Sequence, residues 1–117
     1  TYRERLVNND AFYGLLAEAG RVAAKLSEPG EILTVAHQGP VIAYYADRRY
    51  LMLYTMNEDA IAQTLAKTRL LIWDPTTWLA LPPERVAGVE ARVLADFAPI
   101  EHVSDGSRIV TIYQRKP

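Results

Sequence analysis

Four polar residues with side chains suited to acid–base or binding chemistry follow the short apolar stretches of this sequence. They are His37 and Gln38 after residues 31–36, Asn57 after residues 50–54, and Asp74 after residues 70–73. In open α/β sheets, ligands bind beyond the carboxyl ends of the strands, so these side chains are expected to line one crevice. Its aromatic lining is predicted to include Tyr45 and Trp78.

The residue types in such a crevice suggest specific roles. His37 has the side chain that most readily exchanges a proton near neutral pH, and Asp74 is suited to orienting it or to holding a cation. Tyr44 or Tyr45, together with Trp78, offers a surface on which a sugar or another planar ligand can stack. The sequence therefore permits a small-ligand site, but each of these residues also has a structural interpretation.

The structural interpretations are the ones that we favour. The dipeptide Asp74-Pro75 is typical of a helix N-cap with proline at the first helical position. A histidine in a strand-to-helix turn is commonly a hydrogen-bonded structural residue, and tyrosines commonly pack in a core or at a sheet edge. The pair Arg48-Arg49 is expected to lie in a solvated turn, although arginines are also suited to binding a phosphate.

Several classes of function are disfavoured by what the sequence lacks. It has no cysteine, which excludes disulfides, thiol nucleophiles and cysteine-based zinc sites. Its 13 basic and 14 acidic residues give a net charge of −1, so we expect no nucleic-acid partner. Glycine-rich phosphate-binding motifs and a G-x-S-x-G motif are missing, and the two histidines, His37 and His102, are far apart in sequence. We therefore expect no cofactor and no metal.

Hydrophobic periodicity predicts alternating helices and strands. Apolar residues at three- and four-residue spacing predict a helix over about residues 9–28. Further helices are predicted at residues 41–46, after Asn57 and after Pro83, and strands at residues 31–36, 50–54, 70–73, 97–103 and 108–115.

This order of elements predicts an α/β fold. Alternating strands and helices imply right-handed crossovers and a parallel sheet, and a tight turn at residues 104–107 makes the last two strands antiparallel. We expect a small three-layer Rossmann-like sheet, mostly parallel, with a C-terminal antiparallel hairpin. A chain of 117 residues buries one core, so residues 1–117 are predicted to be a single domain, with residues 1–7 as a linker. Because no signal-peptide pattern follows Thr1, we expect the chain to be part of a longer protein.

The order of several segments carries a resemblance to a known family. The segments are Ser27-Glu28-Pro29-Gly30-Glu31-Ile32, Ala43-Tyr44-Tyr45-Ala46-Asp47-Arg48, Leu70-Leu71-Ile72-Trp73-Asp74, and residues 97–113 with their Asp105-Gly106 turn. In this order they resemble the soluble C-terminal domain of polytopic membrane glycosyltransferases of the dolichyl-phosphate-mannose protein mannosyltransferase group. The resemblance covers about residues 10 to 115.

The resemblance implies a non-catalytic accessory domain on the extracytoplasmic side of a membrane, periplasmic or cell-surface. The parent enzyme would transfer a sugar from a polyprenyl-phosphate carrier to an acceptor, and the domain would aid acceptor access or the stability of the fold. The catalytic residues of that group lie in a loop between early membrane helices, so none carries over to this sequence. The implied partners are the membrane-embedded part of the same polypeptide, joined through residues 1–7, and a lipid-linked sugar or acceptor.

Two other interpretations stay open. The chain could be a free-standing small α/β enzyme or ligand-binding protein that uses His37, Asp74 and Tyr45 in the crevice, with a phosphorylated substrate as one option. It could also be a partner-binding module, in which an exposed final strand at residues 109–113 pairs edge to edge with another chain.

Overall fold

The computed structural model describes the backbone of residues 2–74 and 83–117, and the side chains of residues 11–74 and 83–117. These residues form an α/β fold with four α-helices, one short 3₁₀ helix and five strands. In chain order the elements are α1 (Tyr2–Leu26), β1 (Ile32–Val35), α2 (Gly39–Ala46), β2 (Arg49–Met52), η1 (Leu53–Thr55), α3 (Glu58–Lys67), β3 (Leu70–Trp73), α4 (Pro83–Asp96), β4 (Phe97–Ser104) and β5 (Ile109–Arg115).

The five strands form one mixed sheet with the order β2-β1-β3-β5-β4. Strand β1 pairs in parallel with β2 on one side and with β3 on the other. Strand β5 runs antiparallel to both of its neighbours, β3 and β4. Four strands therefore point in one direction and β5 points in the other, so the prediction of a mostly parallel sheet with a C-terminal antiparallel hairpin is confirmed.

The prediction that the final strand forms an exposed edge is wrong. Strand β5 lies between β3 and β4, so the edges of the sheet are β2 and β4. The reason is that Val110 and Ile112 of β5 are completely buried, whereas β4 contains Pro99 and a register shift between Pro99 and Glu101. Proline cannot donate to a neighbouring strand, and an irregular strand disfavours further pairing, so β4 is the strand suited to an edge.

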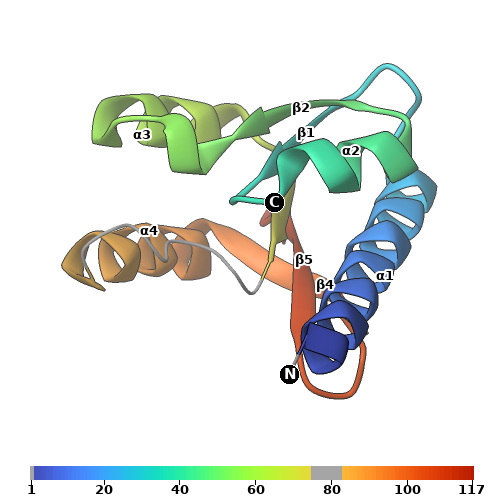
Figure 1. Ribbon diagram of the computed structural model, residues 1–117. Coiled ribbons are helices and arrows are strands. Elements are labelled where there is room, and N and C mark those ends of the chain that lie inside the picture. The colour runs from blue at the N-terminus through green and yellow to red at the C-terminus, as the bar shows by residue number, and fades with distance from the viewer. Residues whose placement is uncertain (1, 75–82) are drawn as a thin grey trace.

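Apolar side chains form two clusters on opposite faces of the sheet, because successive strand residues point to opposite sides. On one face, α1 and α2 cover a cluster that includes Leu16, Leu33, Ile42, Leu70, Ile72, Val110 and Ile112. On the other face, α3 and α4 cover a cluster that includes Leu53, Ile61, Leu65, Leu71, Val89, Val93 and Phe97. Figure 1 shows α1 and α2 together on one side, with α3 and α4 together on the other.

Helix α1 is longer at its start than predicted. The sequence predicted a helix from about residue 9 and a linker at residues 1–7, whereas the helix begins at Tyr2 and ends at Leu26. The segment before residue 9 contains Arg, Glu and Leu, which have high helix propensity, so it continues the helix instead of preceding it.

The carbonyl end of α1 is held by Arg48, which was predicted to lie in a solvated turn. Its guanidinium donates to the backbone carbonyls of Ala24 and Ser27, both at 3.1 Å, and to the Ser27 hydroxyl at 3.1 Å. It also bonds the carbonyl of Ala46 at 3.1 Å. The last carbonyls of a helix have no partner within it, and a positive charge at this end is favourable. The prediction of a solvated turn was wrong for Arg48; its neighbour Arg49 is exposed, as predicted, but it begins β2 and does not lie in a turn.

A second arginine, Arg69, holds the same end of α1. It donates to the carbonyl of Leu26 at 2.8 Å and makes two hydrogen bonds of 2.7 Å to the Glu31 carboxylate. The hydrogen bond from Arg69 lowers the pKa of Glu31 below its ordinary value, and the same bond raises the pKa of Arg69. The pair therefore fixes the turn between α1 and β1.

The turn of the C-terminal hairpin is ordered by Asp105. Its Oδ1 accepts hydrogen bonds from the backbone N–H groups of Ser107 at 3.0 Å and Arg108 at 2.8 Å. These bonds stabilise the ionised carboxylate and lower its pKa to about 2. Gly106 has a φ of +96°, a conformation that favours glycine. The predicted turn at residues 104–107 is therefore confirmed.

Candidate functional site

The winding of the sheet changes direction beside β1, and three of the residues predicted to line a crevice lie at this point. After β1 the chain passes to β2 on one side, and it then returns to β3 on the other side of β1. In open α/β sheets such a switch point leaves a crevice beyond the carboxyl ends of the two central strands, where ligands commonly bind. Here these ends lead into His37 and Gln38 after β1 and into Asp74 after β3.

The structure brings His37, Gln38 and Asp74 together. Asp74 is completely buried, and its Oδ1 accepts the backbone N–H groups of His37 at 2.9 Å and Gln38 at 3.1 Å. Gln38 is the N-cap residue of α2. The carboxylate of Asp74 therefore lies at the positive end of this helix, where it interacts favourably with the helix dipole.

This arrangement gives Asp74 a structural role at the switch point. Backbone amides at the start of a helix form a ready-made site for an anion. In this chain the two amides before α2 already donate to the chain's own carboxylate. The predicted N-cap of Asp74 with Pro75 involves a residue outside the described part of the chain. The role that the structure does show for Asp74 is to tie the turn after β1 to the end of β3.

His37 packs against an aromatic ring. Its imidazole centroid is 4.5 Å from that of Tyr54, with the two rings tilted by 56°. Tyr54 belongs to η1 and donates its backbone N–H to the carbonyl of Ala36 at 3.0 Å. The sequence predicted a strand over residues 50–54, but the strand ends at Met52, and the 3₁₀ turn that follows places Tyr54 beside His37.

The other predicted site residues have separate positions. Asn57 caps α3, the helix predicted to follow it: its side-chain oxygen accepts from the Ala60 N–H at 2.8 Å. Tyr45 lies in α2 at the end opposite Gln38, with the Arg21 guanidinium carbon 5.3 Å from its ring centroid. The prediction that Tyr45 lines the crevice is therefore wrong, because α2 carries it toward α1. Trp78 lies outside the described residues.

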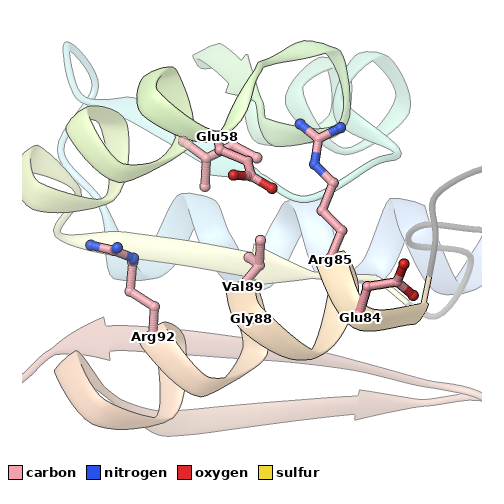
Figure 2. Close-up of a pocket in the computed structure, with 7 residues that line it drawn as sticks. Glu58, Glu84, Arg85, Gly88, Val89 and Arg92 are labelled. Atoms are coloured by element: carbon pink, nitrogen blue, oxygen red, sulfur yellow. The ribbon is translucent and has the colours of Figure 1, made fainter.

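A cleft between α3 and α4 was missed by the sequence reasoning. It has a volume of about 230 Å³ and is lined by Glu58, Ile61, Glu84, Arg85, Gly88, Val89 and Arg92. In Figure 2, Arg85 extends from α4 toward the start of α3, and Glu58 lies on the opposite wall. Arg85 Nη2 donates to the Met56 carbonyl at 2.9 Å, while its buried Nε makes no hydrogen bond.

The sequence did contain a signal for this cleft. Residues 85, 89 and 92 follow the spacing of one helix face, so the pattern Arg-Val-Arg places two guanidinium groups on either side of an apolar residue. The cleft contains positive and negative side chains, and its seven lining residues include no histidine, serine or threonine. Among the described residues, it therefore offers carboxylate and guanidinium groups but no hydroxyl or imidazole.

Two further properties of the described part of the chain concern metals and membranes. Within it, no three His, Cys, Asp or Glu side chains come together as a metal site. None of the helices formed by residues 2–74 and 83–117 combines the length and the apolar character needed to cross a membrane. No family model, curated protein or solved structure matches the chain.

Proposed function

We propose that this chain is a non-catalytic accessory domain of an integral membrane glycosyltransferase that uses a polyprenyl-phosphate-sugar donor. The domain lies on the extracytoplasmic face of the membrane. Its partners are the membrane-embedded part of the same polypeptide and a lipid-linked sugar or acceptor. It contributes to acceptor access or to the stability of the parent enzyme.

The position of Asp74 is the observation that carries the proposal. The switch-point crevice is where an enzyme of this architecture would hold its ligand. In this chain the buried Asp74 carboxylate binds the amides of His37 and Gln38 at that place. The acidic residue after the third strand then has a structural role and not a catalytic one. This agrees with the resemblance, because the resembling stretch at residues 70–74 ends in this aspartate.

The order of the elements gives a second line of support. The Pro29-Gly30 turn leads into β1, the Tyr44-Tyr45 pair lies in α2, and the Asp105-Gly106 turn joins β4 to β5. The resembling segments thus fall on successive elements of one fold. The apolar clusters on the two faces of the sheet further support the proposal that the fold is a small three-layer Rossmann-like one.

The parentage of the chain is tested in native cells. An antibody raised against this chain is used to blot membrane and soluble fractions, and intact spheroplasts are treated with external protease. We expect a band much larger than 13.1 kDa in the membrane fraction, trimmed by the protease. A soluble band near 13.1 kDa would overturn the proposal and would favour the free-standing ligand-binding protein.

A further inference from the structure

A surface hollow lies beside the connection between α2 and β2, away from the switch-point crevice. It has a volume of about 760 Å³ and is lined by Pro29, Pro40, Ala43, Tyr44, Asp47, Arg48, Arg49 and Tyr50. The lining combines two tyrosine rings and two prolines with carboxylate and guanidinium groups. No role described above uses the tyrosines, Asp47 or Arg49.

The walls of this hollow are fixed by the fold. The hydrogen bonds of Arg48 to the end of α1 and to the Ala46 carbonyl anchor the α2–β2 connection. The ring of Tyr50 lies against the backbone at Gly39, where an added Cβ would be 2.6 Å from two ring carbons. Glycine is therefore required at position 39 for this placement of the ring. A ligand would meet a surface that is already organised, which lowers the entropic cost of binding.

The groups that face solvent in the hollow are available for a ligand. Tyr44 is 79% exposed and Tyr50 is 39% exposed. The ring of Tyr44 is held edge-on to that of Tyr45, with centroids 5.2 Å apart and an interplanar angle of 84°. The side chains of Asp47 and Arg49 make no hydrogen bond or ion pair with any residue that the structure describes.

We propose that this hollow binds a pyranose ring of a neutral glycan. The C–H face of a sugar ring is apolar and packs on an aromatic ring, while the phenol group of tyrosine also offers a polar contact. Neighbouring hydroxyl groups of a sugar can accept from the Arg49 guanidinium and donate to the Asp47 carboxylate. The Arg48 guanidinium is already bonded to backbone carbonyls, and the Asp47 carboxylate offsets the charge of Arg49, so the hollow favours a neutral ligand over a phosphate or a cation.

The glycan has a place in the function proposed above. In a glycosyltransferase, the bound glycan would be the sugar of the acceptor or of the lipid-linked donor. This identification of the glycan rests on the proposed function. The binding chemistry itself rests only on the residues of the hollow. The two proposals can therefore fail separately.

Binding is tested by titrating the ¹⁵N-labelled chain with maltose, cellobiose and α-1,2-mannobiose at millimolar concentrations. We expect at least one sugar to produce saturable changes in the backbone amide signals of residues 39–51. Tyr44→Ala and Arg49→Ala each lower the affinity about tenfold, which corresponds to about 1.4 kcal/mol. Tyr13→Ala is the matched control, because Tyr13 is 55% exposed on α1 and does not line the hollow. The spectrum of each variant also reports whether it is folded.

The proposal is overturned if none of the three sugars changes the signals of residues 39–51, or if Tyr13→Ala weakens binding as much as Tyr44→Ala does. Exposed tyrosines can also bind a membrane surface. Sedimentation of the chain with lipid vesicles tests this alternative. If the chain sediments with phosphatidylcholine or phosphatidylglycerol vesicles through Tyr44, and sugars do not compete, the glycan site is also overturned. If the chain belongs to a membrane protein but binds no sugar, only the glycan site is overturned. If the chain is a free soluble protein that binds a sugar, only the proposed parentage is overturned.

Discussion

Arg48 Nε donates to the Ser27 hydroxyl at 3.1 Å, and that hydroxyl lies 2.7 Å from the Ala23 carbonyl, to which it donates. The other guanidinium nitrogens of Arg48 bond backbone carbonyls at the end of α1 and in the α2–β2 connection. One planar side chain therefore connects two parts of the chain that are separated in sequence, residues 24–27 and residues 46–48. The flat fork of arginine makes this possible, whereas lysine carries a single compact charge.

Replacing Arg48 is expected to destabilise the domain. In Arg48→Ala the carbonyls of Ala24 and Ser27 lose their side-chain partner, and the loss is about 1–3 kcal/mol of unfolding free energy. Arg48→Lys should recover less than half of it. Urea denaturation measures the unfolding free energy of both variants. Arg49→Ala, at the exposed neighbouring position, is the control, and its unfolding free energy is expected within about 0.5 kcal/mol of the wild-type value. Equal effects at the two arginines would contradict the anchoring role.

Replacing Asp74 is expected to affect stability whether or not any ligand is present. Asp74→Ala leaves the partly buried N–H groups of His37 and Gln38 without this acceptor, at a cost of about 2–3 kcal/mol. Asp74→Asn keeps an acceptor oxygen and should cost less. Thermal or urea unfolding of the ligand-free chain gives the values. If Asp74→Ala unfolds at the same urea concentration as the wild type, the structural role assigned to Asp74 is wrong.

Two glycines of α1 are expected to respond in opposite directions to alanine. A Cβ at Gly20 would stand 2.6 Å from the Ile42 carbonyl oxygen and 2.8 Å from Tyr45 Cβ, so α1 and α2 would have to separate. Gly20→Ala should destabilise by about 1–3 kcal/mol. A Cβ at Gly14 meets nothing within 4 Å, and Gly14→Ala should stabilise the helix by about 0.5–1 kcal/mol. Both shifts are read from thermal unfolding, and a stabilising Gly20→Ala would refute the close helix contact.

The Glu31–Arg69 pair is expected to make stability depend on pH. The pKa of Glu31 is below its ordinary value of 4.5 because of the hydrogen bond from Arg69. The contribution of the ionised carboxylate is therefore complete above pH 4.5 and is lost as the pH falls through the lower pKa of the folded state. Since the Arg69 side chain is 46% exposed, we expect only about 0.5–1 kcal/mol.

This dependence is measured by comparing wild type with Glu31→Gln in urea at a series of pH values. The difference in unfolding free energy should be constant near neutral pH and shrink below pH 4.5, where Glu31 becomes protonated. Glu18→Gln provides the control, because the Glu18–Arg21 pair lies on the exposed surface of one helix. If the difference in unfolding free energy between wild type and Glu31→Gln grows as the pH falls, the prediction is wrong, because a lowered pKa of Glu31 requires the difference to shrink.

The order of helices and strands could be predicted because it depends on local patterns. Asn57 before α3, Pro83 at the start of α4 and the Asp105-Gly106 turn each mark a boundary through their own side-chain chemistry. The position of β5 in the sheet was missed, because a hairpin turn does not determine which of its two strands pairs with a third. Pro99 in β4 was the available clue, since a strand that contains proline is suited to an edge.

The candidate site could be predicted only in part. The positions of His37, Gln38 and Asp74 after central strands correctly indicated that they meet. The positions of strand ends predict which residues lie close together but not which hydrogen bonds they make. The hydrogen bonds from two backbone amides to Asp74 could therefore not be predicted from the sequence. Tyr45 was misplaced because it lies seven positions after Gln38 in the helix, which is roughly 10 Å along the helix axis. The arginines that hold α1 make contacts across 21 to 43 residues of sequence, and no local pattern reports these.

The insertion of β5 between β3 and β4 has a consequence for biosynthesis. A ribosome adds residues in order, and domains usually acquire structure as complete units after they emerge. When residues 2–104 have been made, β4 still has no neighbour in the sheet, because the strand that joins it to β3 is the last of the five to be synthesised. Strand β4 must therefore wait for its partner until translation has passed residue 115. A stop codon early in β5 would therefore release a chain whose β3 edge is open to quality-control proteases and chaperones.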